Sequence, residues 1–426
     1  MNISSSSKAL FACVSGTALQ WYDFALFGYF APIIATTYFS NNNRYVSMFS
    51  AFTVFAVGYL LAPLGALLFG FIGDHFGRKK ALTISILAMA IATAMIGLVP
   101  SYNAIGIAAP ILITLFRLIQ GFVASAEYVG SAVFLVEHAK PHKKALYGCL
   151  TSSAYSLGFI LAGLVTSFCT QAFMPDWAWR LGFGFSLIAG ILIFYLRKQV
   201  TETPEYQNID NLNKPKQPFL YALKQEPLAV LGVMGISWLV SIMTFGTYVF
   251  LATYLHTYFN LHLILTTLLI TFALAVDSIL EPFVAILADR VGYVKVFSFG
   301  ITSLLVLSIP IFSLISSGSI LSIAFGLICM SVIIAISYAP LNAYMVSLFP
   351  SECRYSGFGV SFNIGISVFG GTTPLVMLWL VNKTGNYMSP AWYYMFGAII
   401  GLLSLLVCEY SRKRLMNKQP GLVFNY

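Results

Sequence analysis

Long apolar stretches, separated by short polar ones, occupy almost the whole chain. A helix that spans a bilayer needs roughly 20 apolar residues, and the alternating pattern of a membrane β-barrel does not occur in the sequence. We therefore predict an all-α membrane protein. Twelve stretches are long enough to be transmembrane helices: 10–38, 47–72, 80–99, 104–136, 145–171, 178–196, 227–256, 263–287, 294–315, 319–347, 356–381 and 390–410.

One long polar stretch, 197–226, interrupts this pattern and leaves six predicted spans on each side. The midpoint of the chain falls inside it. We predict an N-terminal six-helix half, a cytoplasmic linker loop, a C-terminal six-helix half and a cytoplasmic tail, at 1–196, 197–226, 227–411 and 412–426.

The two halves share a repeated motif. Residues 70–82 read GFIGDHFGRKKAL and residues 285–297 read AILADRVGYVKVF, so the offset is 285 − 70 = 215. Each copy follows the second predicted span of its half. Two six-helix halves related by repetition are typical of transporters, whose substrate site lies near the midplane between the repeats.

Composition and charge agree with a membrane protein. The chain is 59% hydrophobic and 9% charged, whereas soluble domains are about 25% charged. With twelve spans, 19 of the 23 Lys and Arg, Arg197 and Lys198 among them, fall on one side. By the positive-inside rule both termini are cytoplasmic. The net charge of +9 is therefore a topology signal, and we expect no nucleic-acid partner. The first apolar run is too long for a cleaved signal peptide, and it contains Asp23.

Five ionisable residues lie well inside predicted spans: Asp23, Arg117, Glu127, Asp277 and Glu281. Each costs about 2.5–3.5 kcal/mol at mid-membrane, and such residues mark ion or substrate paths. Arg117 stays charged. We expect it to bind a substrate carboxylate or to bias a nearby acid; the alternative is that it ties its helix to a neighbour.

The acids are candidates for proton coupling. A carboxyl group balanced between burial and a nearby cation can load and release a proton. Glu127 is ten residues from Arg117, about 15 Å along a helix, so we expect its partner on another helix, the first being our choice. Asp277 and Glu281 are one turn apart and repel each other, which favours a shared proton. The alternative for each is a structural, hydrogen-bonded acid.

The repeated motif also predicts a conformational lock. Asp74 ends the second span, Gly77 makes a turn, and basic residues follow, so a charge network can hold one conformation. The alternative is a plain basic anchor. The residues of the predicted lock are Gly70, Asp74, Gly77, Arg78, Lys79, Asp289 and Arg290.

Other residues are candidates for binding the substrate. Aromatic faces attract a quaternary ammonium, although most aromatic residues simply pack. Gln120 lies one turn from Arg117, and Gly121 makes room for it. Gly-Gly before Pro374 predicts a bend. The further candidates are Gln20, Trp21, Tyr22, Gln120, Tyr128, Trp238, Tyr338, Asn342 and Asn363.

The sequence gives little basis for a metal site, a cofactor or an enzyme. The six Cys contain no CxxC pair, and none of the five His forms an HxxxH or HxxE pair within a predicted span. A metal centre needs such clusters, and we expect neither a metal nor another cofactor.

Several motifs carry a family resemblance. GFIGDHFGRKK (70–80) resembles the loop signature of the major facilitator superfamily. QWYDF (20–24) resembles the E-W-[FY]-D-F pattern of its metabolite:proton symporter branch, and RLIQGFVASAE (117–127) resembles that branch's RxxQGxxxGGE. The likeness runs from about residue 9 to 410, and IGLVPSYNAIG (96–106) is most similar to proline/betaine transporters.

This resemblance implies a proton-coupled importer of a small zwitterion, working by alternating access as a monomer in a bacterial inner membrane. Two departures are Gln20, where the branch usually has Glu, and Glu281, where related sequences often have Gln. One alternative is a proton symporter of an organic acid, with Arg117 and Arg180 binding carboxylates. Another is a transport-inactive sensor on the same fold.

Overall fold

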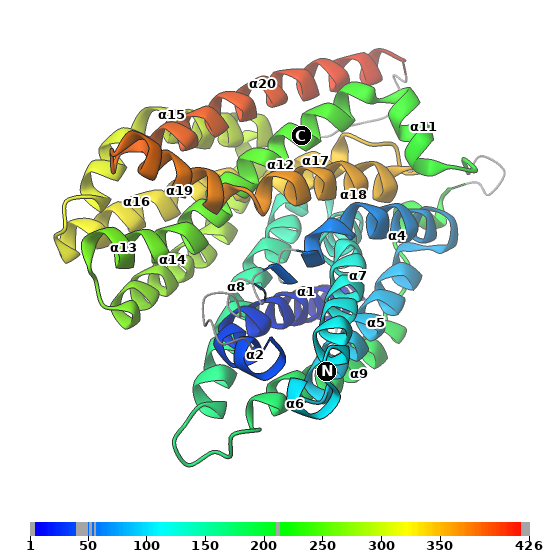
Figure 1. Ribbon diagram of the computed structural model, residues 1–426. Coiled ribbons are helices and arrows are strands. Elements are labelled where there is room, and N and C mark those ends of the chain that lie inside the picture. The colour runs from blue at the N-terminus through cyan, green and yellow to red at the C-terminus, as the bar shows by residue number, and fades with distance from the viewer. Residues whose placement is uncertain (1–4, 40–49, 51–52, 55–56, 210–213, 419–426) are drawn as a thin grey trace. The chain divides into compact units, whose positions relative to one another are not determined.

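The structure is a computed structural model that describes residues 5–39, 50, 53–54, 57–209 and 214–418 (Figure 1). Within these ranges every regular element is a helix and no strand occurs. Ten helices in the described part are long and apolar enough to span a bilayer, and Ala62–Phe76 is apolar but shorter. The all-helical membrane fold is confirmed. The count of twelve spans stays a prediction, because neither 10–38 nor 47–72 is among the ten helices, and part of 47–72 lies outside the described residues.

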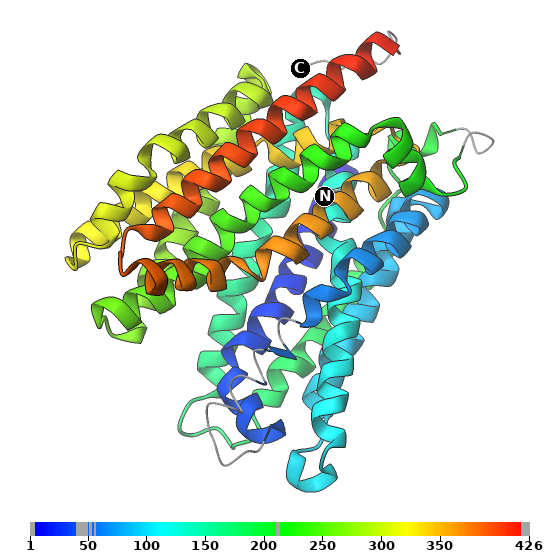
Figure 2. The same cartoon turned by 45° about the horizontal axis from the view of Figure 1, so that its top comes forward.

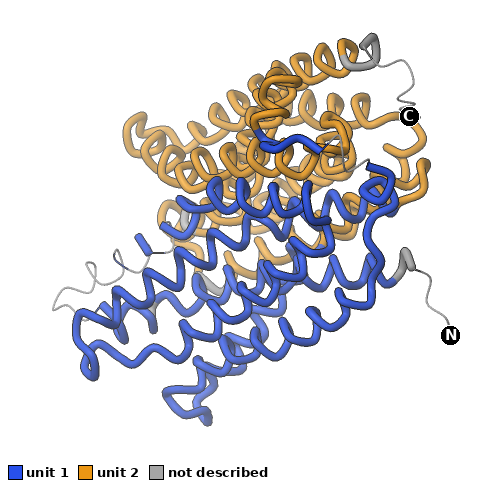
Figure 3. Tube along the Cα trace, turned by 90° about the vertical axis from the view of Figure 1, so that its right-hand side faces the viewer, with its two compact units in different colours: residues 1–138, 154–219 blue, residues 139–153, 220–426 orange. Residues whose placement is uncertain are grey.

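The chain forms two compact units (Figure 3). Unit 1 comprises Met1–His138 and Ala154–Phe219, and unit 2 comprises Ala139–Ser153 and Leu220–Tyr426. The division falls within α8, so the first ten residues of this helix count with unit 2.

Unit 1 is a helical bundle in which proline and glycine set the breaks. The predicted span 10–38 is two helices, because a proline, which has no backbone N–H, lies at the start of α2. Gly77 separates α4 from α5 with a φ of 110°. The helices are α1 Ser5–Tyr29, α2 Ala31–Tyr38, α4 Ala62–Phe76, α5 Arg78–Leu98, α6 Tyr102–Ile105, α7 Ala108–His138, the larger part of α8 Lys144–Cys169, α9 Trp179–Lys198 and α10 Pro204–Gln207.

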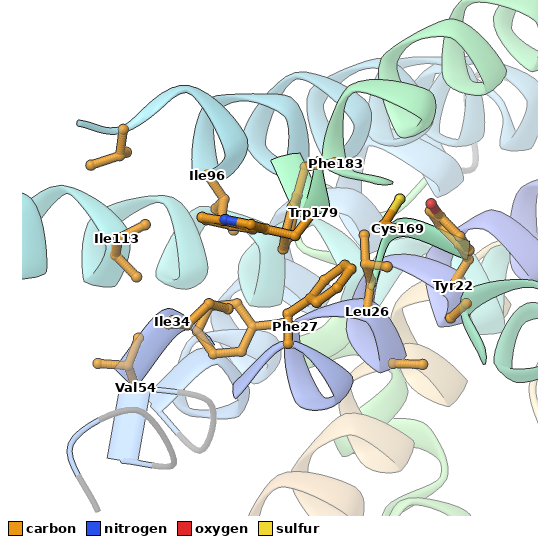
Figure 4. Packing of buried hydrophobic residues seen from close by; sticks show 14 of the residues in the cluster. Tyr22, Leu26, Phe27, Ile34, Val54, Ile96, Ile113, Cys169, Trp179 and Phe183 are labelled. Carbon is orange, nitrogen blue, oxygen red and sulfur yellow. The ribbon is translucent and has the colours of Figure 1, made fainter. Parts of the chain in front are cut away.

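The core of unit 1 lies between α1 and α9. Leu26 and Phe27 of α1 pack with Trp179 and Phe183 of α9, and all four are buried (Figure 4). Gly97 of α5 is needed here, because a Cβ at this position would overlap Phe183. This packing holds the middle of α1, where Asp23 lies, in a fixed position.

Unit 2 contains the remaining helices, with α20 beside α12 (Figures 1 and 2). Two predicted spans are interrupted by π-helical turns, η3 and η4, and the predicted break before Pro374 occurs at the start of α19. The elements are η1 Pro141–Lys143, α11 Pro218–Gln225 at the boundary, α12 Pro227–Phe245, η3 Gly246–Phe250, α13 Leu251–Phe259, α14 Leu263–Val291, α15 Tyr293–Ile315, α16 Ile320–Tyr338, α17 Leu341–Ser347, α18 Arg354–Gly365, η4 Ile366–Gly370, α19 Thr373–Thr384 and α20 Ser389–Lys418.

The internal repeat seen in the sequence is also present in the packing. In unit 1, α5 packs against α7 and α9, α4 against α7, and α1 against α9; in unit 2, α15 packs against α16 and α20, α14 against α16, and α12 against α20. The first, second, third, fourth and sixth spans of each half therefore make corresponding contacts. The turn glycines also correspond: Gly77 and Gly292 have φ of 110° and 106°, and 292 − 77 = 215.

The outer surface is apolar, as a bilayer requires. On α20 the exposed large side chains recur every three to four residues and so form one stripe along the helix. These are Trp392, Phe396, Ile399, Leu403, Leu406 and Tyr410.

Candidate functional site

A chain of hydrogen bonds links the buried Arg117 of α7 to the buried Asp23 of α1. Arg117 Nη1 donates to Gln120 Oε1 (2.8 Å), Gln120 Nε2 donates to Thr93 Oγ1 (2.6 Å), and Thr93 Oγ1 donates to Asp23 Oδ2 (2.8 Å). All four side chains are fully buried. Every donor in the chain points towards the carboxylate. The two charges therefore stabilise each other through two neutral side chains in a low-dielectric interior.

The two oxygens of Asp23 are in different environments. Oδ2 accepts from Thr93 and also from Ser186 Oγ of α9 (3.0 Å). Oδ1 has no hydrogen-bond partner among the described residues. Since an ionised carboxylate oxygen can accept more than one hydrogen bond, Oδ1 is the atom on which a proton or a ligand donor can bind.

Aromatic rings of α1 hold the guanidinium of Arg117. Its Cζ lies 4.3 Å from the ring centroid of Phe24 and 4.7 Å from that of Phe27, which is cation–π distance. Gly121 makes room for neighbouring backbone, because a Cβ at this position would overlap the backbone of Gly58.

Gln20, Trp21 and Tyr22 precede Asp23 on α1 and differ in whether their polar atoms have hydrogen-bond partners. Gln20 Nε2 donates to the Ala124 carbonyl (3.1 Å), but Gln20 Oε1 and Trp21 Nε1 are buried without a partner among the described residues. Tyr22 donates to the Gly182 carbonyl (2.7 Å) and lies in the core (Figure 4). Because buried polar atoms are normally paired, Gln20 and Trp21 are available to a ligand, while Tyr22 joins α1 to α9.

Glu127 finds its partner on α9, not on the first helix as we expected. Arg197 Nη1 donates to Glu127 Oε2 (2.9 Å), and a second contact joins Nη2 and Oε1. Ser85 and Ser131 also donate to Glu127 (3.1 and 3.4 Å). Gly16 of α1 lies against this pair, and a Cβ there would overlap it.

Arg197 is a correction to the sequence interpretation, which counted it only among the basic residues of the cytoplasmic side. It is 3% exposed. A long side chain in the last turn of a helix can point outward or back into the bundle, and here it points back because Glu127 and the carbonyls of Ala12 and Leu82 accept its donors.

Unit 2 holds a second pair of buried carboxylates on α14. Asp277 and Glu281 are 5% and 2% exposed. Tyr248 donates to Asp277 Oδ2 (3.0 Å), whereas Ser152 and Ser153 both donate to Glu281 Oε2 (2.7 and 3.0 Å). Asp277 Oδ1 has no hydrogen-bond partner among the described residues. The two acids share one face of α14, as the spacing predicted.

Trp238 packs against two other aromatic rings. It stacks on Phe369, with centroids 3.7 Å apart and an interplanar angle of 7°, and it meets Phe396 edge-on. Phe396 belongs to the exposed stripe of α20. One face of Trp238 is therefore covered by protein.

The remaining candidates make contacts with backbone. Tyr338 donates to the Val240 carbonyl (3.1 Å) and is also hydrogen-bonded to Thr244. Asn342 Nδ2 donates to the Gly148 carbonyl (2.9 Å), and Asn363 Nδ2 donates to the Gly359 carbonyl (2.8 Å) of its own helix. Tyr128 of α7 is buried.

The first copy of the repeated motif forms the charge network that its residues suggested. Arg78 Nη1 lies 3.2 Å from Asp74 Oδ1, and Arg78 Nε lies 3.4 Å from Glu137 Oε2 of α7. Arg78 also donates to the Gly73 carbonyl (2.8 Å). Gly70, Asp74 and Arg78 are buried. The motif thus joins α4, α5 and α7.

The polar stretch after α9 completes this network. The Glu202 carboxylate accepts from the backbone N–H of Lys79 (3.1 and 3.2 Å), at the start of α5, where an anion is favoured by the helix dipole. Thr203 donates to Glu137 (2.5 Å). Burial raises the pKa of Glu202, although the hydrogen bonds from Thr203 and Lys79 and the charge of Arg78 act against this.

The second copy of the repeated motif makes different contacts from the first. Asp289 accepts from the backbone N–H groups of Ala145 and Leu146 (2.8 and 3.0 Å) and from the hydroxyl of Tyr293 (3.0 Å). It therefore caps the first turn of α8, and Arg290 is exposed. Tyr293 occupies the position of Arg78 in the first copy, so a guanidinium is missing from this part of the second motif.

Arg180 is engaged with backbone. Its Nη1 donates to the carbonyls of Gly97 and Val99 (2.6 and 2.7 Å) at the end of α5, and its Cζ lies 4.9 Å from the Trp179 ring. This arrangement stabilises the end of α5 and leaves Arg117 as the carboxylate-binding candidate of unit 1.

Comparison with known proteins establishes the family. A sequence profile described as Major Facilitator Superfamily matches residues 13–370. The chain belongs to the major facilitator superfamily. The resemblance carried by the motifs is confirmed, and the protein is a membrane transporter of this family, not an enzyme.

Relatives within the superfamily are named for one solute class. The "Proline/betaine transporter" of Escherichia coli (strain K12) is 35% identical over 415 residues, which cover 93% of this chain and 82% of the relative. A "Putative proline/betaine transporter" of Staphylococcus haemolyticus (strain JCSC1435) is 33% identical over 412 residues, covering 95% and 88%.

Solved structures support the superfamily fold. The proton:xylose symporter XylE aligns with a TM-score of 0.78 at 15% identity, covering 95% of both chains. The human organic anion transporter MFSD10 aligns with a TM-score of 0.73 at 15% identity, covering 95% of this chain and all of that one. At these identities the likeness concerns the fold alone.

The residues of these networks that the sequence analysis missed include Thr93, Ser186, Glu137 and Arg197. A single hydroxyl in an apolar helix, such as Thr93 or Ser186, is too common to be a signal. Glu137 and Arg197 lie near helix ends, where charged residues are ordinary anchors. The pairing of Glu127 with Arg197 becomes visible only when α7 and α9 are placed side by side in three dimensions.

Proposed function

We propose that the protein is a proton-coupled symporter that imports a small zwitterion of the proline or glycine betaine class by alternating access. The observation that carries this proposal is the hydrogen-bond chain from Arg117 to Asp23. It links a permanent cation, suited to a substrate carboxylate, to an acid that has one unpartnered buried oxygen among the described residues. The names of the relatives support the solute class.

The proposed coupling follows from the charges. Without substrate, the positive charge of Arg117 stabilises the Asp23 carboxylate through Gln120 and Thr93. A substrate carboxylate binding to Arg117 competes with Gln120 for the guanidinium and weakens the chain. Asp23 then binds a proton on Oδ1. After this step Arg117 is paired with the substrate carboxylate and Asp23 is neutral, so the one charge left without an ionic partner is the ammonium of the zwitterion, for which an aromatic face is the proposed contact.

Gln20 and Trp21 are the proposed contacts for the rest of the substrate. Their unpartnered Oε1 and Nε1 atoms lie on α1 beside Asp23, and the Trp21 ring meets Tyr155 edge-on with centroids 4.7 Å apart. An indole face is a good partner for a quaternary ammonium. Tyr128 remains a proposed contact.

Asp23 is a better proton carrier than Glu127 in this proposal. Glu127 already has a bidentate cationic partner, Arg197, and two hydroxyls, and such pairs have strong, specific geometry. We therefore assign Glu127 and Arg197 to joining α7 and α9, and Asp23 to coupling.

The topology that we propose has twelve spans in two six-helix halves, both termini in the cytoplasm, and a monomer in a bacterial inner membrane. The repeat at an offset of 215 and the one-sided Lys and Arg support it. The network of Asp74, Arg78 and Glu137, completed by Glu202, would stabilise one conformation of the transport cycle.

Uptake into proteoliposomes tests the proposed function. Labelled proline, glycine betaine, 2-oxoglutarate and citrate are offered with and without an inward proton gradient. We expect gradient-driven accumulation of proline or glycine betaine, and its loss in Asp23→Asn. Accumulation of 2-oxoglutarate or citrate instead would favour the organic-acid alternative, and accumulation by Asp23→Asn would contradict the coupling scheme.

A further inference from the structure

The carboxylates of Asp277 and Glu281 lack the compensation that buried acids have in unit 1. Asp23 is linked to Arg117, Glu127 pairs with Arg197, and Asp74 pairs with Arg78. In the described residues, Asp277 and Glu281 have only hydroxyl partners, from Tyr248, Ser152 and Ser153. Two buried carboxylates one helical turn apart need positive charge from elsewhere.

Two hydroxyl groups lie against one oxygen of Glu281. Ser152 and Ser153 both place their hydroxyls on the same oxygen, Glu281 Oε2, at 2.7 and 3.0 Å. The Ser152 hydroxyl also donates to the Cys149 carbonyl (2.7 Å), and a hydroxyl oxygen in this position can serve as a ligand to a cation. The positive charge that this site needs can be a proton or a bound cation.

The donor set is made only of oxygens. Asp277 and Glu281 supply carboxylate oxygens, and Ser152, Ser153 and Tyr248 supply hydroxyl oxygens around them. Oxygen-only sets suit hard cations, while softer transition metals prefer nitrogen or sulfur ligands. Asp277 Oδ1, on a side chain 5% exposed, is unpartnered among the described residues and is available as a further ligand.

A quaternary ammonium fits this site less well. It binds to the faces of aromatic rings, and the ring that contacts the pair, Tyr248, presents its hydroxyl to Asp277 Oδ2 at 3.0 Å. A compact cation can use the hydroxyl and carboxylate oxygens together, which a quaternary ammonium cannot.

We propose that Asp277 and Glu281, with the hydroxyls of Ser152, Ser153 and Tyr248, bind a small monovalent metal cation, for which Na⁺ is the probe. This replaces the proton that the sequence suggested for this pair, and it goes beyond the proposed function, which assigns the coupling proton to Asp23. The ion would be a second requirement for transport, held within unit 2 and independent of the substrate carboxylate.

Equilibrium binding of radioactive Na⁺ to the purified full-length protein tests this site. The assay is run without substrate at alkaline pH, with KCl or N-methylglucamine chloride keeping the ionic strength constant. We expect saturable binding that unlabelled Na⁺ displaces and N-methylglucamine does not. Glu281→Gln and Asp277→Asn should each weaken binding at least about tenfold, since even outer-shell changes cost this much at metal sites.

Three further variants make the result specific. Ser153→Ala removes one hydroxyl and should weaken Na⁺ binding less than Glu281→Gln does, and it keeps the test open if a carboxylate variant fails to fold. Asp176→Asn changes an exposed carboxylate and should bind Na⁺ like the wild type. Asp23→Asn should also keep its Na⁺ binding while losing proton-driven uptake, so failure of the two proposals can be told apart.

Two results would contradict the proposed cation site. Absence of saturable Na⁺ binding in the wild type would overturn the proposal and leave protons to neutralise the pair. Equal Na⁺ binding by Glu281→Gln, Asp277→Asn and the wild type would also overturn it, because the ion would then bind elsewhere.

Discussion

Thr93 is the residue whose substitution probes the chain between Arg117 and Asp23 most selectively. Thr93→Val keeps the shape of the side chain but removes the hydroxyl that donates to Asp23 (2.8 Å) and accepts from Gln120 (2.6 Å). Thr93→Ser keeps the hydroxyl and is the matched control. Neither substitution changes a charged group.

The magnitude follows from the type of hydrogen bond that is lost. A hydrogen bond to a charged group contributes about 1.5–3 kcal/mol, and Thr93→Val removes it from the ionised form of Asp23. Since 1.36 kcal/mol corresponds to one pH unit, protonation of Asp23 should occur at a pH higher by about 1–2 units. The bond from Gln120 to Thr93 is neutral and should contribute less.

The assay is the pH dependence of solute uptake in proteoliposomes, recorded for the wild type, Thr93→Val and Thr93→Ser. We expect the midpoint of the profile to move to higher pH in Thr93→Val and to stay near the wild-type value in Thr93→Ser. A loss of stability alone would lower uptake at every pH without moving the midpoint. An unchanged midpoint in Thr93→Val would refute the proposed link between Arg117 and Asp23.

Three further predictions concern the networks near the ends of the helices. Glu127→Gln leaves Arg197 buried without its charge partner and should cost about 3–5 kcal/mol of unfolding free energy, measured by thermal denaturation in detergent; a wild-type melting curve would contradict this. Gly77→Ala should destabilise more than Gly292→Ala by the same assay, because both have positive φ but only at Gly77 would the Cβ overlap another described residue, Glu202. Since burial raises the pKa of Glu202, its docked form is favoured at low pH and weakens as the pH rises through that pKa; limited proteolysis of 201–209 should therefore speed up with rising pH, but not in Glu202→Gln.

Much of the fold could be predicted from the sequence, because the length of an apolar stretch and the position of a glycine act on the local backbone. Ten of the predicted spans reappear as apolar helices in the described residues. The turn at Gly77 and its counterpart at Gly292 follow from the repeated motif, since both need a positive φ that glycine adopts at little cost. The break between α1 and α2 has a local cause too, a proline at the start of α2, but the apolar pattern across 10–38 hid it.

The site was accessible only in part. Asp23, Arg117 and Gln120 stand out because charged or amide groups are costly in a bilayer. The partner of Glu127 could not be read from the sequence, since an arginine at a helix end has the same pattern whether it points to water or into the bundle. Thr93 was also beyond reach, because its role depends on its position between Gln120 and Asp23 in three dimensions. Trp238 shows the converse: its depth suggested a ligand contact, but Phe369 covers one of its faces.

The central claim is that substrate binding at Arg117 drives proton binding at Asp23. The most direct test is to add unlabelled proline or glycine betaine to proteoliposomes that have no imposed gradient and to record the internal pH. Our account predicts that the solute acidifies the interior in the wild type, and that Asp23→Asn exchanges solute without moving protons. Solute entry into wild-type vesicles with no change in internal pH would contradict it.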